Sequence, residues 1–142
     1  MKVGFVGLGI MGAPMARDSG RAVAEASDIV ILMVPDTPDV AQGLSPGKLV
    51  IDMSSIPPTA TTDFANRIND LGCDYLDAPV SGGSVGAVNG ALTIMVGGPQ
   101  AAFDRALPLF ELMGGAAAST ILENHGARML EGNFEPGFRA EL

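Results

Sequence analysis

The chain has 142 residues, with eight lysines and arginines against sixteen aspartates and glutamates, and its net charge at pH 7 is −8. This length supports one buried core, and the acidity excludes proteins that bind nucleic acid or an anionic membrane through a basic face. No run is apolar enough to span a membrane, and the single cysteine excludes a disulfide framework and a cysteine-rich metal site, so we expect a cytoplasmic protein without a metal.

The first predicted element is a short buried strand over residues 3–6, which leads into a glycine-rich turn. Gly7, Gly9 and Gly12 have the G-x-G-x-x-G spacing of a dinucleotide-binding turn. In such a turn the glycines allow a tight bend, a close approach to a pyrophosphate, and packing of the next helix on the strand. The N–H groups at that helix start attract negative charge. An ordinary turn between a strand and a helix is the alternative reading of the same spacing.

Strand and helix signals alternate along the rest of the chain. Ser19 is placed to cap a helix that ends near Ala26, and the continuous apolar run over residues 29–34 is typical of a strand buried on both faces. Further strands are expected at 49–51, 74–80 and 91–96, further helices at 57–71, 99–113 and 116–130, and turns or loops at 36–38, 45–48, 81–84 and 89–90. This alternation predicts an α/β fold of the Rossmann type, with a doubly wound parallel sheet.

Four loops follow the carboxyl ends of the predicted strands. They comprise residues 7–12, 34–35, 54–55 and 81–83. Ligands of doubly wound sheets bind beyond the carboxyl ends of the strands, so these loops are the candidate site.

Several segments resemble the β-hydroxyacid dehydrogenases, a family that includes 3-hydroxyisobutyrate dehydrogenases and tartronate semialdehyde reductases. The N-terminal signature of the family resembles Val6–Ala16, and residues 28–35, 51–56, 76–83 and 92–98 resemble later segments in the family's order. Met-Ser-Ser at 53–55 and the tail at 133–139 are similar to the tartronate semialdehyde reductase branch. The resemblance implies an NAD- or NADP-dependent oxidoreductase, a homo-oligomer, that reduces the small carboxylate substrate tartronate semialdehyde to D-glycerate.

The resemblance also implies roles for individual residues. The implied cofactor-binding residues are Gly7, Leu8, Gly9, Ile10, Met11, Gly12, Val34, Pro35, Asp39 and Ser55. The substrate carboxylate would be bound by Ser81, Gly82 and Gly83, through a hydroxyl and backbone N–H groups. A mobile surface loop is the alternative for residues 81–83, and a helix cap before Pro57 is an alternative or additional role for residues 54–55.

The family's proton donor has no counterpart in this sequence. Reduction of an aldehyde leaves an alkoxide that must take a proton, and the family supplies it from a lysine on the long helix of its second domain. Here Lys2 precedes the first strand, and Lys48 lies in a turn at the wrong end of its strand. His125 lies beside Glu123 in a charged segment and is expected to be exposed. No catalytic residue is therefore assigned.

The sequence predicts two domains and three junctions at which family segments are absent. Residues 1–113 would form an NAD(P)-binding Rossmann-type domain that lacks segments near 17/18 and 41/42. Residues 114–142 would be the remnant of an all-α second domain, and the third junction lies near residues 114–116, where the lysine-bearing helix of the family is absent. Without the segment after the second strand of the family, NAD and NADP stay equally possible. Taken literally, the sequence instead places Asp36 after the second strand, where it would bind a ribose 2′-hydroxyl and imply NAD.

Three alternatives to the reductase stay open. A 3-hydroxyisobutyrate dehydrogenase would share the nucleotide site and differ in the substrate pocket. An imine reductase has the same first domain and also lacks the family lysine, although Ser81-Gly82-Gly83 favours an acid substrate. A catalytically silent dinucleotide-binding fragment would bind NADH or NADPH without turnover.

Overall fold

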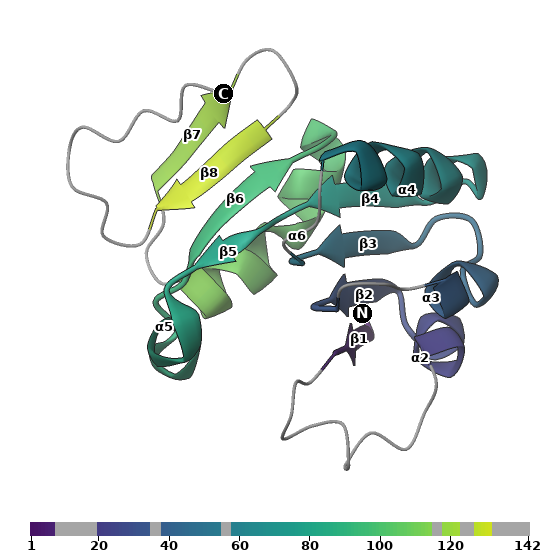
Figure 1. Ribbon diagram of the computed structural model, residues 1–142, viewed down its shortest axis with the longest axis horizontal. Coiled ribbons are helices and arrows are strands. Elements are labelled where there is room, and N and C mark those ends of the chain that lie inside the picture. Colours follow the sequence, from purple (N-terminus) through teal and green to yellow (C-terminus); the bar gives the residue numbers. More distant parts are fainter. Residues whose placement is uncertain (8–19, 35–37, 55–57, 115–117, 123–126, 132–142) are drawn as a thin grey trace.

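A computed structural model describes residues 1–7, 20–34, 38–54, 58–114, 118–122 and 127–131. The described strands form one mixed sheet in the order β1-β2-β3-β4-β6-β8-β7, and β5 pairs with β6 (Figure 1). The strands are β1 (Val3–Val6), β2 (Ile29–Leu32), β3 (Leu49–Asp52), β4 (Asp74–Asp77), β5 (Val80–Ser81), β6 (Thr93–Gly97), β7 (Ala118–Leu122) and β8 (Ala127–Glu131). The helices are α2 (Gly20–Ala26), α3 (Pro38–Gln42), α4 (Pro58–Asp70), α5 (Gly83–Asn89) and α6 (Gln100–Gly114).

Strands β1 to β4 form the parallel half of the sheet, in a register that pairs Leu32 with Asp52 and Asp52 with Asp77. Every residue of β2 and β3 is buried, as the continuous apolar runs in the sequence predict for strands covered on both faces. The doubly wound arrangement is confirmed, because helices cover both faces of these strands.

Two apolar clusters hold the helices to the sheet. On one face, Ala102, Phe103, Ala106 and Phe110 of α6 pack on strand residues that include Ile51. On the other face, Ala24 of α2, Val40 of α3 and Ile68 of α4 pack on Val30 and Val50. Alternate residues of one strand therefore supply opposite cores, which holds the parallel strands in a single register.

The other half of the sheet is antiparallel and corrects two predictions. β6 pairs antiparallel with β4 and with β8, and β8 pairs with β7. The helix predicted for residues 116–130 is wrong, because 118–122 and 127–131 are strands, of which β8 pairs with β6 and β7 pairs with β8. The loop predicted for residues 81–84 is also partly wrong, since helix α5 begins at Gly83. The described part of residues 114–142 therefore does not form an all-α remnant.

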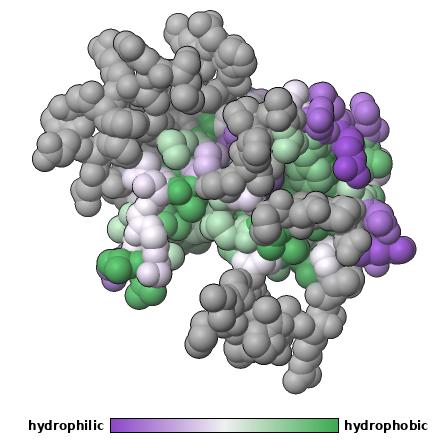
Figure 2. Space-filling view, in the orientation of Figure 1, coloured by the Kyte–Doolittle hydropathy of each residue, from purple (hydrophilic) through white to green (hydrophobic). Residues whose placement is uncertain are grey.

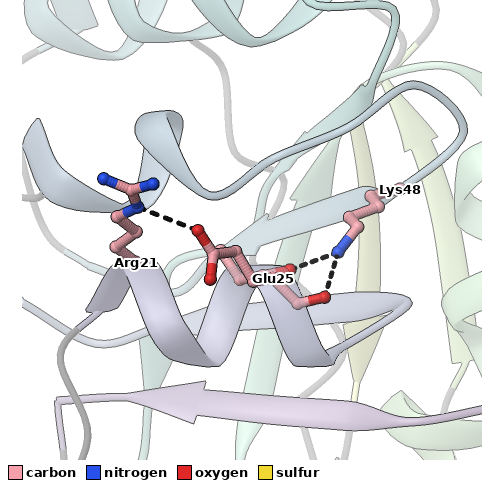
Figure 3. Close-up of polar contacts among 4 residues, drawn as sticks. Arg21, Glu25 and Lys48 are labelled. Carbon is pink, nitrogen blue, oxygen red and sulfur yellow. Dashed lines mark hydrogen bonds and ion pairs between the residues drawn. The ribbon is translucent and has the colours of Figure 1, made fainter.

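The amino end of the parallel strands holds Lys48, in the predicted turn at residues 45–48. Its ammonium group donates hydrogen bonds to the carbonyl oxygens of Ala24 and, at 3.0 Å, Glu25, in the last turn of α2 (Figure 3). A cation at a helix carboxyl end satisfies unpaired carbonyls and opposes the negative end of the helix dipole. Arg21 pairs with Glu25 at 2.8 Å on the exposed side of the same helix. Lys48 thus stabilises α2, and it lies at the amino end of β3, where the sequence places it.

No helix in the described part of the chain is both long enough and apolar enough to cross a membrane.

Candidate cofactor site

Three of the predicted loops meet at the carboxyl edge of the parallel sheet. The Met33 N–H donates to the Val6 carbonyl at 2.9 Å, and the Met53 N–H donates to the Leu32 carbonyl at 2.8 Å. The Val34 N–H donates to Ser54 Oγ at 3.0 Å. The chain segments that leave β1, β2 and β3 are therefore joined side by side, as ligand-binding loops of a doubly wound sheet are expected to be.

Gly7 begins the glycine-rich turn with a backbone that other residues rarely adopt, at φ +98°. A Cβ placed there would lie 2.3 Å from Cγ1 of Val34 and 2.4 Å from the carbonyl oxygen of Met33. Gly7, the first residue after β1, therefore packs directly against Met33 and Val34, and both the left-handed φ and the close contact require glycine. Two residues predicted to bind the cofactor, Gly7 and Val34, are neighbours in space.

Three residues at this edge were not predicted from the sequence. Asp52 is buried at 3% exposure, and its carboxylate accepts hydrogen bonds from the Ser54 N–H at 2.9 Å and the Tyr75 hydroxyl at 3.0 Å. Asp77 is half-buried and lies next to Asp52 in the register of β3 and β4. A local signal was present, because the strands Leu-Val-Ile-Asp and Asp-Tyr-Leu-Asp both end in aspartate.

Burial and neighbouring charge change the acidity of this cluster. Burial first, and the nearby Asp52 carboxylate second, raise the pKa of the Tyr75 hydroxyl, which therefore stays protonated and donates to Asp52. The same two causes raise the pKa of Asp77 to about 6. Two carboxyl groups on adjacent strand ends disfavour charging both of them at once.

The raised pKa of Asp77 predicts a loss of stability as the pH rises. The folded protein holds this proton up to about pH 6, whereas an unfolded chain releases it near its ordinary value of 3.8, so the free energy of unfolding falls as the pH rises between these values. Allowing for the partial exposure of the carboxyl, we expect Asp77→Asn to be about 1 kcal/mol more stable than the parent chain at pH 7.5, with the difference shrinking toward pH 4. Urea unfolding at the two pH values measures this. An equal difference at both would show that the charge of Asp77 is not the cause.

The fourth predicted loop lies beyond the same edge. β5 continues past the end of β4 and pairs antiparallel with β6, Ser81 opposite Thr93 (Figure 1). Ser81, Gly82 and Gly83 are all exposed, and the two glycines have left-handed backbones at φ +126° and +59°. These residues therefore lie on the carboxyl side of the sheet.

Helix α5, which follows this loop, presents an apolar surface. Val85 is 72% exposed and Val88 is 85% exposed. Figure 2 shows the corresponding green atoms at the lower left, where Figure 1 places α5.

The chain is similar to known proteins over most of its length. The family model for the NAD binding domain of 6-phosphogluconate dehydrogenase matches residues 17–123. A 2-hydroxy-3-oxopropionate reductase of Escherichia coli is 37% identical over 234 residues, which cover all of this chain and 80% of the relative. The chain belongs to the β-hydroxyacid dehydrogenase family.

Other members of the family are similar over a shorter part. An NAD-dependent L-serine dehydrogenase of Pseudomonas aeruginosa is 34% identical over 80% of this chain and 51% of the relative. A solved Mycobacterium tuberculosis 3-hydroxyisobutyrate dehydrogenase with L-serine is 31% identical, with a TM-score of 0.69 over 81% of this chain and 53% of that chain. A solved structure of Psf3 in complex with NADP+ and 2-OPP is 25% identical, with a TM-score of 0.69 over 78% of this chain and 54% of that chain. The chain thus spans about half the length of these three relatives.

The site residues that the family resemblance predicts lie only partly within the described part of the chain. Leu8, Gly9, Ile10, Met11, Gly12, Pro35, Ser55 and also Asp36 and His125 lie outside them. Asp39 belongs to helix α3, which follows the loop after β2. Of the two lysines, Lys48 lies at the amino end of the parallel strands, where β3 starts, and Lys2 precedes β1. Neither lies at the edge that carries Gly7, Val34 and Ser54.

Proposed function

We propose that this chain binds NAD or NADP across the carboxyl ends of β1, β2 and β3, and that it is a tartronate semialdehyde reductase. The observation that carries the cofactor site is the contact of the Gly7 turn with Val34, whose N–H is in turn held by Ser54. The backbone after β1 thereby lies close to the loop after β2, which is bonded to the loop after β3, as the pyrophosphate-binding turn of a dinucleotide site requires. The 37% identity to the Escherichia coli reductase supports the substrate.

The substrate site is proposed at Ser81, Gly82 and Gly83. They are exposed, lie beyond the same sheet edge and have no side chain larger than a hydroxymethyl group. A small carboxylate would therefore reach the Ser81 hydroxyl and the backbone N–H groups beside it. The hydride would pass from the nicotinamide to the aldehyde carbon, and the resulting alkoxide would need a proton. Turnover therefore requires a proton donor, and no residue of this sequence corresponds to the family lysine.

We further propose that family segments are absent at the junctions 17/18 and 41/42 within a Rossmann-type domain over residues 1–113, and at a third junction near residues 114–116, where a second domain would begin. The matched stretch of the Escherichia coli reductase has 234 residues against 142 in this chain, so 92 of its residues have no counterpart here. The match to the family model begins at residue 17. In addition, β1 lies at the edge of the sheet and leaves Val3 and Phe5 more than 40% exposed.

A second candidate function is a dinucleotide-binding module without turnover. It is favoured by the placement of Lys2 and Lys48 away from the candidate site. The homo-oligomer and the cytoplasmic location stay predictions.

An oxidation assay separates the two candidates. The chain, its intact mass first verified, is mixed with NADH or NADPH and with tartronate semialdehyde or methylmalonate semialdehyde, and the loss of absorbance at the nicotinamide band is followed. The reductase proposal expects turnover that is faster with tartronate semialdehyde and reduced at least tenfold by Ser81→Ala. Binding of the cofactor without any oxidation would support the silent module. Preference for methylmalonate semialdehyde would instead favour a 3-hydroxyisobutyrate dehydrogenase.

A further inference from the structure

The carboxyl ends of β2 and β3 are connected to β4 by a network of three hydrogen bonds that involve side chains. The Tyr75 hydroxyl donates to Asp52 Oδ2, and Asp52 Oδ1 accepts from the Ser54 N–H. Ser54 Oγ then accepts from the Val34 N–H. Val34, the last residue in this hydrogen-bond network, is the residue against which Gly7 packs. A single buried carboxylate is thus linked to all three loops of the candidate cofactor site.

The carboxylate is costly at this place in the fold. Asp52 is 3% exposed, lies on the same sheet face as the apolar Val50 and Leu32, and has the half-buried Asp77 as its register neighbour on β4. Removing a charge from water is unfavourable, and a second carboxyl group nearby adds repulsion. A strand end that served only for packing would be more stable with an apolar residue.

Tyr75 is itself held in place, so the hydrogen-bond network has a rigid support. It is 4% exposed, and its ring packs edge-on against Phe64 of α4, with ring centroids 5.7 Å apart. The Asp52 carbonyl also accepts the Ala78 N–H at 2.7 Å, which ties the ends of β3 and β4 together. The carboxylate of Asp52 is therefore oriented by the Tyr75 hydroxyl of β4 and by the Ser54 N–H in the loop after β3.

We propose that Asp52 is a positioning residue for the cofactor, which acts through Ser54 to hold Val34 and the adjoining Gly7 turn in the shape that a dinucleotide binds. This inference rests on the proposed cofactor site. It assigns no contact between Asp52 and the cofactor, because Asp52 is only 3% exposed.

The test measures affinity and stability separately. The dissociation constants for NADH and NADPH are obtained from nicotinamide fluorescence, thermal unfolding gives stability, and hydrogen exchange reports the Val34 amide without any ligand. Asp52→Ala and Ser54→Ala are each expected to weaken binding of the cofactor with the higher affinity about tenfold. Each is also expected to speed hydrogen exchange at the Val34 amide. The double variant is expected to lose no more affinity than either single variant, because both remove the same connection.

Conservative variants distinguish positioning from a general loss of stability. Asp52→Asn keeps an oxygen for the Ser54 N–H and is expected to restore affinity to within about threefold of the parent. Tyr75→Phe is expected to lower the unfolding temperature but to change cofactor affinity little, since Asp52 Oδ1 still accepts the Ser54 N–H. Asp74→Asn, at the exposed far end of β4, is the matched control.

Each outcome decides the proposal. If the parent chain binds neither cofactor, the proposed cofactor site itself fails, and the positioning role fails with it. If the parent binds and the Asp52 and Ser54 variants bind equally well, only the positioning role is overturned. Losses of affinity that add in the double variant would also overturn it, because Asp52 would then not act through Ser54.

Discussion

Gly7→Ala is expected to abolish measurable cofactor binding and to destabilise the chain by about 2–4 kcal/mol. The new Cβ would lie 2.3 Å from the Val34 side chain and 2.8 Å from the Met33 carbonyl carbon, and the backbone at φ +98° is strained for any residue with a Cβ. The turn after β1 must therefore move away from the turn after β2. Fluorescence titration with NADPH and NADH, together with urea unfolding, measures both effects.

The matched control for this substitution is Gly47→Ala. Gly47 has a similar backbone at φ +88°, but nothing lies within 4 Å of a Cβ built there, and it belongs to the turn at the amino end of β3. We expect it to cost about 1 kcal/mol from backbone strain and to leave affinity within twofold. If the two alanine variants lose affinity equally, the contact between Gly7 and Val34 is not what shapes the cofactor site.

Phe110→Ala is expected to lower the free energy of unfolding by about 3–5 kcal/mol. Phe110 is completely buried in the core between α6 and the sheet, and its ring lies 5.9 Å from that of Phe103. Truncation removes apolar contacts and leaves a cavity that the strands around it fill only in part. Denaturant unfolding measured by circular dichroism reports the change.

Leu112→Ala on the same helix is the control for Phe110. Leu112 is 77% exposed, so its truncation is expected to change stability by less than about 0.5 kcal/mol. A loss in the Leu112 variant as large as that in the Phe110 variant would mean that α6 does not pack on the sheet through the face described.

The parallel half of the fold was predictable because its signals are local. The apolar run over residues 29–34 indicates a strand buried on both faces, and the structure has β2 there with every residue buried. The helix expected at 99–113 is α6, shifted by one residue, since its apolar residues recur on one face. Gly7 was also predictable, because its role depends on the turn that directly follows a strand.

The antiparallel half and the Asp52 network depend on contacts between distant residues. β8 is a strand because it pairs along β6, more than 30 residues earlier in the chain, and no local pattern in residues 116–130 shows that partner. The Tyr75 hydroxyl and Asp52 are 23 residues apart and meet only because β3 and β4 are in this register. Sequence periodicity identifies strands but does not give their register, so these residues were missed.

The measurement that most directly tests the cofactor site is a titration of the parent chain with NADPH and with NADH, followed by nicotinamide fluorescence. The account predicts saturable binding of one cofactor per chain for at least one of the two, competed by the matching oxidised cofactor and lost in Gly7→Ala. Absence of saturable binding for both cofactors at millimolar concentration would contradict a dinucleotide site at the carboxyl edge of β1, β2 and β3.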